Sequence, residues 1–113
     1  MEDLFEVSVS QRGDACVVTA VGEVDVSTAP ELRQKLREQP EDAFVVVDLS
    51  DVTFLDSTGL GVLVAALKRV REHEAGGELR LVVSRPQVSK VLEVTGLSGV
   101  FSIHPTLDEA LAR

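Results

Sequence analysis

The sequence of 113 residues has no tryptophan, no tyrosine, a single cysteine and two histidines. Its four phenylalanines are the only large aromatic side chains, so a core must be built from aliphatic residues. Cys16 alone cannot form an internal disulfide or a cysteine-based metal cluster, and we expect it to be a buried thiol in a strand. His73 and His104 have no partner at ligand spacing, so we expect them to be ordinary surface residues rather than metal ligands.

Positive charge is also scarce. Eleven lysines and arginines face nineteen aspartates and glutamates, which gives a net charge of −8. This balance argues against nucleic acid or an anionic membrane surface as a partner. No signal-like segment opens the sequence, and no apolar run approaches the ~20 residues of a membrane-spanning helix. We therefore expect a soluble cytoplasmic protein.

Hydrophobic residues make up 44% of the sequence, and their spacing predicts alternating strands and helices. Five segments have strand patterns, at residues 4–10, 15–21, 44–49, 78–83 and 100–103. Four segments have helix patterns, at residues 28–38, 57–74, 84–95 and from 106 onward. The order is β-β-α-β-α-β-α-β-α, and strands joined through helices run parallel. The sequence thus predicts one α/β domain over residues 1–113, with a mixed, mostly parallel sheet and an N-terminal hairpin.

Polar residues mark several predicted helix ends. Thr28 with Glu31, and Ser84 with Gln87, have the spacing of a capping box. Gly96 is placed to end the third helix in the left-handed conformation.

The stretch 44–67 carries the one local feature with a chemical consequence. A near-continuous apolar strand over 44–49 leads through a short acidic connection into a long apolar helix. Ser57 and Thr58 stand where that helix begins, and serine and threonine are favoured helix N-caps. The simplest interpretation is that this hydroxyl pair caps the helix.

Catalytic motifs are missing around this pair. The serine lacks the G-x-S-x-G elbow, and neither a Walker-type loop nor a G-x-G-x-x-G turn occurs. Asp48, Asp51 and Asp56 cluster near one strand end, which suggests a metal or phospho-aspartate site. A receiver-type site would also need acidic residues after the first strand and a late lysine after a strand, and this sequence has neither. We therefore expect no enzymatic activity, no metal and no cofactor.

A helical wheel suggests a docking surface beside the hydroxyl pair. The expected core face carries Leu60, Leu63, Val64, Leu67 and Val70. The opposite face carries Thr58, Gly61, Val62, Ala65 and Arg69. A solvated face would normally be polar, and glycine costs roughly 1 kcal/mol relative to alanine in a helix interior. Small apolar residues there favour close approach by another protein.

Several landmarks together resemble the STAS domain of bacterial anti-sigma factor antagonists. They occur in the family's order along nearly the whole sequence: GEVD at 22–25, VVVDL at 45–49, FLDSTGLG at 54–61, GGEL at 76–79 and VTGL at 94–97. The resemblance implies a STAS-like fold and a regulatory protein without catalysis of its own.

In that family the serine after the motif aspartate is phosphorylated, and here that residue is Ser57, with Thr58 as a minor alternative. The kinase is the partner itself, an anti-sigma factor of the histidine-kinase-like ATPase type. The unphosphorylated antagonist binds this partner and frees a sigma factor, and a metal-dependent serine phosphatase reverses the modification. The resemblance places Asp25 and the turn 56–61 in the partner-binding region.

Taken with the helical wheel, the expected binding residues are Asp25, Asp56, Ser57, Thr58, Gly59, Gly61, Val62, Ala65 and Arg69. We expect the protein to be a monomer or a weak dimer.

Two alternatives stay open. One is a non-switching STAS scaffold, in a stressosome or a transport complex. The other is a nucleotide-binding module, although the sequence has no phosphate-cradling motif.

Overall fold

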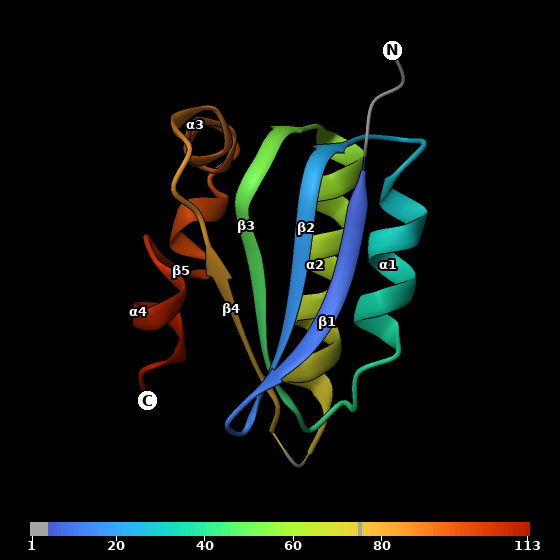
Figure 1. Cartoon of the computed structure of the whole chain (residues 1–113), viewed down its shortest axis with the longest axis vertical. Helices are drawn as coiled ribbons and strands as arrows, with labels where there is room; N and C mark the ends of the chain where they lie inside the picture. Colours follow the sequence, from blue (N-terminus) through green and yellow to red (C-terminus); the bar gives the residue numbers. More distant parts are fainter. Residues whose placement is uncertain (1–4, 75) are drawn as a thin grey trace.

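A five-stranded sheet forms the centre of the molecule, as the computed structural model of residues 5–74 and 76–113 shows (Figure 1). The strands lie in sequence order across the sheet: β1 (Glu6–Arg12), β2 (Ala15–Val24), β3 (Phe44–Leu55), β4 (Glu78–Val82) and β5 (Ser102–His104). Only β1 is antiparallel to its neighbour, and the other strands pair in parallel. The predicted mixed sheet with an N-terminal hairpin is therefore confirmed.

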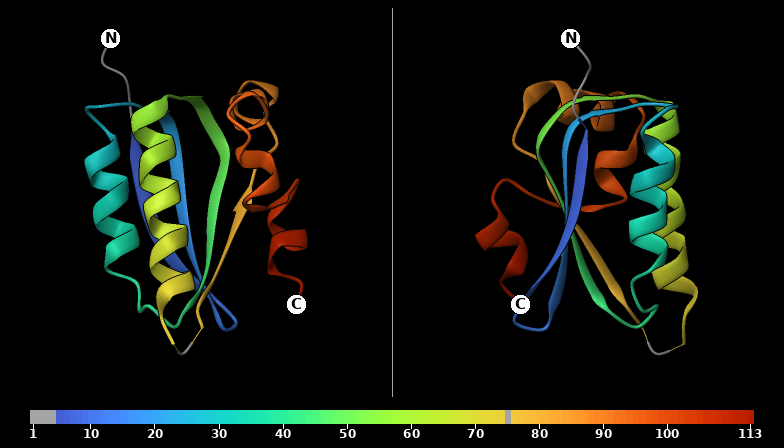
Figure 2. Two further views of the ribbon diagram at one scale, coloured as in Figure 1. Left: turned by 180° about the vertical axis from the view of Figure 1, so that it is seen from behind. Right: turned by 45° about the vertical axis from the view of Figure 1, so that its right-hand side comes forward.

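The helices cover both faces of this sheet. They are α1 (Ala29–Arg37), α2 (Ser57–Glu72), α3 (Pro86–Val94) and α4 (Leu107–Leu111). α1 and α2 lie side by side on one face, and α4 lies on the other (Figure 2). α3 packs against β3, and a short 3₁₀ helix, Leu97–Gly99, follows it.

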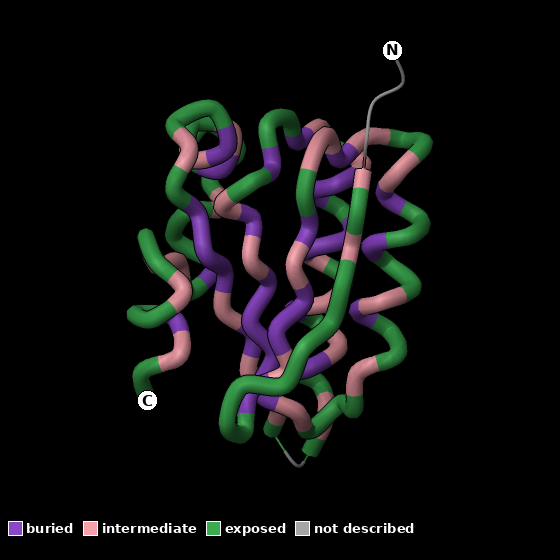
Figure 3. The backbone as a smooth tube through the Cα atoms, in the orientation of Figure 1, coloured by how far each residue is buried: buried purple, intermediate pink, exposed green. Residues whose placement is uncertain are grey.

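Burial follows this arrangement in two layers (Figure 3). The larger core includes the inner stripe of α1, which is Ala29, Leu32 and Leu36. The smaller core lies beneath α4, where Ala110 packs with Phe44 and other residues of the central strands. With almost no aromatic residues, both layers are built mainly from valine, leucine and alanine.

The hairpin differs slightly from the prediction. Its first strand ends at Arg12 rather than residue 10, and Gly13 makes the turn with a φ of 63°. A left-handed φ favours glycine, which explains this residue at the turn. Leu4, the predicted start of the strand, lies outside the described residues.

The central strand is longer than predicted. β3 runs twelve residues to Leu55, so the expected acidic connection after residue 49 is strand and the prediction there is wrong. The reason is that Val52 and Leu55 are buried and pair with the end of β2, which itself extends to Val24. Parallel pairing with β2 therefore keeps this segment extended beyond the apolar run that ends at residue 49.

Other helix and strand ends differ in detail. Neither predicted capping box forms, since Thr28 makes no side-chain cap for α1 and the cap position of α3 is Arg85. Gly96 does take the left-handed conformation, with a φ of 77°, as predicted. The last strand begins at Ser102, because residues 97–99 form the 3₁₀ helix.

The predicted burial of Cys16 is wrong. Its side chain is half-buried, and the thiol donates a hydrogen bond to Oε1 of Gln11 across the hairpin at 3.6 Å. His73 and His104 are also half-buried. In the described residues no group of three His, Cys, Asp or Glu side chains is arranged to hold a metal ion. Within the same residues, no helix has the length and apolar character needed to cross a membrane.

Candidate functional site

Two aspartates lie next to each other where β2 and β3 end. Val24 pairs in register with Leu55, and the N–H of Asp56 donates to the carbonyl oxygen of Val24 at 3.2 Å. Asp25 and Asp56 each follow one of these paired residues. Because β2 and β3 are parallel, both carboxylates stand at the same edge of the sheet, and each precedes a helix.

Asp56 is the N-cap of α2. Its Oδ1 accepts hydrogen bonds from the N–H groups of Thr58 at 2.9 Å and Gly59 at 3.1 Å. The expectation that the hydroxyl pair caps this helix is therefore wrong. Asp56 has extended backbone angles at the end of β3, which is the conformation that an N-cap requires.

This cap leads to a stability prediction. Asp56→Ala should lower the free energy of unfolding by about 1–2 kcal/mol, because two backbone N–H groups lose their acceptor. Asp56→Asn should recover most of that loss, since asparagine is an equally good N-cap. Urea unfolding of the three proteins measures the difference. Equal stability of the alanine variant and the native protein would contradict this role for Asp56.

Ser57 is the first residue of α2 and is exposed. Its hydroxyl makes no hydrogen bond with any other residue that the structure describes. Thr58, one position further on, is half-buried. The serine hydroxyl is thus both accessible and unused by the fold, because Asp56 performs the capping.

Asp25 organises the neighbouring loop in the same way. Its Oδ1 accepts hydrogen bonds from the N–H and hydroxyl of Ser27, at 2.9 and 2.8 Å, and from the N–H of Thr28 at 3.1 Å. These bonds, chiefly those from Ser27, hold the pKa of the Asp25 carboxyl below its ordinary value. The Thr28 hydroxyl turns away from α1 and donates to the carbonyl oxygen of Glu23 at 2.7 Å, which is why no capping box forms.

The predicted outer face of α2 is only partly correct. Gly59 and Val62 are buried, so they do not line a surface. Gly61 and Ala65 are exposed, as predicted. The burial of Val62 follows from packing on two sides, because α2 contacts both the sheet and α1. A helical wheel that assumes one buried face cannot predict the burial of a residue on a second packed face.

Arg69 lies toward the other end of α2 and serves the fold. Its Nη1 donates to the carbonyl oxygens of Leu36 at 3.4 Å and Gln39 at 3.0 Å, at and just beyond the end of α1. Its Nη2 lies 3.9 Å from Oε1 of Glu41. The structure therefore brings together Asp25, Asp56, Ser57 and Thr58, but it leaves Arg69 apart from them.

Two apolar residues at this edge were not anticipated. Phe54 is 49% exposed and Val26 is 72% exposed, and they flank the two aspartates in sequence. Phe54 pairs in register with Glu23, next to the pair that Asp56 follows. An unusual phenylalanine in an aromatic-poor sequence was the available signal for Phe54. No feature of the sequence indicated that Val26 is exposed, because the alternation of inward and outward side chains along β2 would have placed it in the core.

The predicted acidic cluster divides into separate structural contacts. Asp48 accepts hydrogen bonds from the N–H and hydroxyl of Ser50, and Asp51 lies 3.6 Å from Nη2 of Arg85. Asp56 is occupied as a cap. Each carboxylate has its own partner, which is not the arrangement of a shared metal or phospho-aspartate centre.

Comparison with known proteins gives consistent matches. A family model described as the STAS domain matches residues 6–110. The anti-sigma-B factor antagonist of Bacillus subtilis is 38% identical over 100 residues, which cover 88% of this chain and 90% of that protein. The crystal structure of an anti-sigma factor antagonist from Mycobacterium paratuberculosis is 34% identical with a TM-score of 0.83, covering 96% of this chain and 92% of that one. The Bacillus cell fate determinant SpoIIAA in its phosphorylated form is 22% identical with a TM-score of 0.65 over 96% of both chains, which is a likeness of fold.

Proposed function

This chain belongs to the STAS domain family, and we propose that within it the chain acts as an anti-sigma factor antagonist switched by phosphorylation of Ser57. In the unphosphorylated form it binds an anti-sigma factor and so releases a sigma factor. In the phosphorylated form it does not bind. The kinase is the anti-sigma factor itself, of the histidine-kinase-like ATPase type, and a serine phosphatase restores the active form. The chain has no catalysis of its own.

The observation that carries this proposal is the free hydroxyl of Ser57 at the start of α2. A phosphoacceptor must be reachable by a kinase, and its modification must not unfold the protein. Ser57 meets both conditions, because it is exposed and because Asp56 supplies the cap. Thr58 is a weaker candidate because it is half-buried.

Phosphorylation would act on binding rather than on folding. A phosphate adds about −1.5 to −2 charges, and the N-terminus of a helix favours negative charge. The modified chain therefore keeps its fold. At a protein interface the same phosphate adds bulk and charge beside Asp25 and Asp56, and burying an unpaired charge costs several kcal/mol. That cost is large enough to switch a complex off.

The surface around Ser57 also has the composition of a binding site. Phe54 and Val26 provide exposed apolar area close in sequence to Asp56 and Asp25, and hydrogen bonds hold the pKa of Asp25 below its ordinary value. Interfaces commonly combine an aromatic anchor with polar surroundings. The partner surface should therefore offer an apolar pocket bordered by basic residues. Gly61, exposed one turn into α2, allows the partner to approach closely.

A release assay tests this function. A sigma factor labelled with a fluorophore is bound to the anti-sigma factor from the same organism, and unphosphorylated chain is added. The native chain should displace the sigma factor in a saturable manner. Phe54→Ala should need at least tenfold more protein, about 1.4 kcal/mol, because an exposed aromatic anchor is lost without loss of core packing.

The control variant is Val94→Ala, which removes an apolar side chain that is 70% exposed from the end of α3. It should displace the sigma factor as the native chain does. Failure of the native chain to displace any sigma factor would contradict the proposed function. Equal effects of both substitutions would contradict the proposed surface.

This proposal has consequences for the setting in which the protein works. A partner that regulates transcription places it in the cytoplasm. The acidic surface suits a partner with basic patches, and it does not suit nucleic acid or an anionic membrane. We expect a monomer or weak dimer, since the site is complete within one chain.

A further inference from the structure

Positive charge gathers on α1 and α2, although the chain as a whole has a net charge of −8. Six of its eleven basic residues lie on these two helices: Arg33, Lys35, Arg37, Lys68, Arg69 and Arg71. Only Glu31 and Glu72 oppose them within the same two helices. The two helices lie side by side (Figure 2), and three of these residues, Arg33, Arg37 and Arg69, line one pocket between them.

A pocket of about 260 Å³ opens between the two helices. Its lining contains three arginines and no acidic residue: Arg33, Leu36 and Arg37 from α1, with Ala65, Ala66 and Arg69 from α2. Leucine and alanine provide an apolar floor beneath the guanidinium groups. Small-molecule sites typically combine such apolar walls with a few convergent polar groups.

Two of these arginines have no protein partner in the described part of the chain. Arg33 and Arg37 are exposed, and they make no ion pair or hydrogen bond with any described residue. They lie one helical turn apart, where like charges repel each other. The two arginines therefore contribute no described contact that stabilises the fold. A bound anion would offset the repulsion between their positive charges.

The third arginine is fixed in position. Arg69 is held by the carbonyl oxygens of Leu36 and Gln39, which places its guanidinium at one end of the pocket. Its pairing with Glu41 is loose, at 3.9 Å between Nη2 and Oε1. Much of its positive charge therefore stays available to the pocket, while its geometry is set before any ligand arrives.

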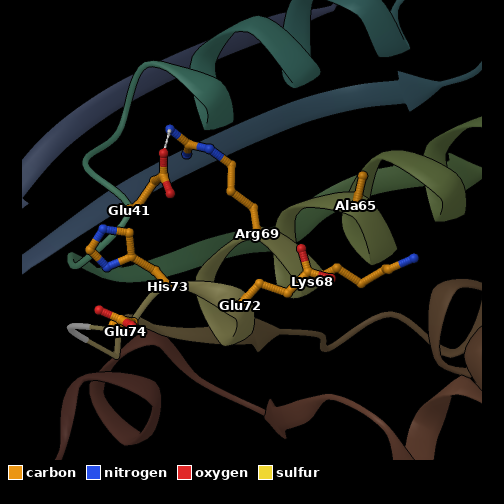
Figure 4. Close-up of a pocket in the computed structure, with 7 residues that line it drawn as sticks. All are labelled: Glu41, Ala65, Lys68, Arg69, Glu72, His73 and Glu74. Carbon is orange, nitrogen blue, oxygen red and sulfur yellow. Dashed lines mark ion pairs between the residues drawn. The ribbon is translucent and has the colours of Figure 1, made fainter.

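The larger hollow beside this pocket lacks the same character (Figure 4). It has a volume of about 750 Å³, and its lining contains three carboxylates as well as a lysine and an arginine. Its polar lining consists of Glu41, Lys68, Arg69, Glu72, His73 and Glu74. The preference for an anion is thus confined to the smaller pocket between α1 and α2.

We propose that the pocket of Arg33, Arg37 and Arg69 binds a small organic anion. Its phosphate or carboxylate group accepts hydrogen bonds from Arg33 and Arg37, whose planar guanidinium groups match both anions in a two-pronged geometry. Its apolar part lies against the alanines of α2. Arg69 stands about 18 Å further along α2 than Ser57, at about 1.5 Å per residue, so this site is separate from the proposed switch.

The test is a titration of the unphosphorylated full chain, followed by ¹H–¹⁵N NMR at constant ionic strength. The probes are phenyl phosphate and benzoate, which distinguish the two anionic groups, with neutral phenol as a control. The variant is Arg33→Gln/Arg37→Gln. The matched control is Arg12→Gln/Lys90→Gln, which removes the same charge from exposed positions on β1 and α3.

We expect at least one of the two anions to cause saturable shifts in α1 and α2. Affinity should fall at least tenfold in Arg33→Gln/Arg37→Gln and stay unchanged in the control variant, and phenol should cause no saturable shift. The melting temperature of Arg33→Gln/Arg37→Gln should equal or exceed that of the native chain, since a repulsive pair is removed.

Three results would overturn the proposal. The first is the absence of saturable shifts with either anion. A hexaglutamate peptide is titrated in parallel, and binding of this peptide alone would make the surface a protein-docking site. The second is an equal loss of affinity in both variants, since that would mean non-specific attraction. The third is a melting temperature several degrees lower in Arg33→Gln/Arg37→Gln, since that would assign the arginines to the fold.

Discussion

Ser57→Asp should weaken binding to the anti-sigma factor by about hundredfold, or 2.7 kcal/mol, while the free energy of unfolding changes by less than about 0.5 kcal/mol. The two effects separate because Ser57 is exposed at the start of α2 and its hydroxyl supports no other described residue. An added carboxylate is compatible with the helix N-terminus, but it is costly in the proposed interface, where it would lie beside Asp56. Calorimetric titration and urea unfolding measure the two quantities.

Ser57→Asn is the matched control for charge, because asparagine has nearly the size and shape of aspartate. It should retain most of the affinity. Comparable losses in the two variants would mean that bulk rather than charge blocks the complex. A large loss of stability in Ser57→Asp would show that Ser57 is part of the structural framework, and it would remove the basis for a switch that leaves the fold intact.

Gly59→Ala should destabilise the protein by about 1–3 kcal/mol. An added Cβ would lie 2.5 Å from Cδ1 of Leu55 and 2.8 Å from Cγ1 of Val24, and both of these side chains are buried. Accommodation requires their displacement in the core beneath the candidate site. This glycine lets α2 approach the ends of β2 and β3, and it thereby fixes the position of Ser57.

Gly61→Ala is the control for this substitution, two positions along the same helix. Apart from its chain neighbours and the surrounding backbone of α2, no atom lies within 4 Å of a Cβ added there, so alanine should raise stability by up to about 1 kcal/mol. Urea unfolding of both variants measures the contrast. Equal destabilisation by the two changes would mean that the close contact of Gly59 with β2 and β3 is unimportant.

The sequence was sufficient to predict the order of strands and helices, because the fold relies on clear apolar periodicity and on the family's landmarks. The end of β3 was not predictable in this way. Residues 50–55 combine three polar with three apolar residues without a continuous apolar run, and they are extended because β2 pairs with them in parallel. Such pairing joins segments far apart in the sequence and leaves little local trace.

The sequence placed Asp56, Ser57 and Thr58 correctly at the start of α2, but it did not show which of them caps the helix. Asp56, Ser57 and Thr58 are consecutive, and all three residue types are good N-caps, so propensity could not choose among them. The backbone hydrogen bond from the N–H of Asp56 to the carbonyl oxygen of Val24 makes Asp56 the last extended residue, and Asp56 is therefore the N-cap. The interpretation of Ser57 changed accordingly, from a helix cap to a hydroxyl that the fold does not use.

The burial of Val62 shows the same limit. One helical wheel separates a helix into inner and outer faces, but α2 packs against the sheet and also against α1. Gly61 remains exposed on the part of α2 that these neighbours leave uncovered, and Ala65 is exposed where it lines the pocket between α2 and α1.

The central claim is that Ser57 accepts the phosphate that controls binding, and intact-mass spectrometry after incubation with the anti-sigma factor kinase and MgATP tests it most directly. The native chain and Thr58→Val should each gain one phosphate and lose their affinity for the kinase. Ser57→Ala should gain none and should remain bound. Full phosphorylation of Ser57→Ala, or a phosphorylated native chain that still binds its partner as tightly as before, would contradict the claim.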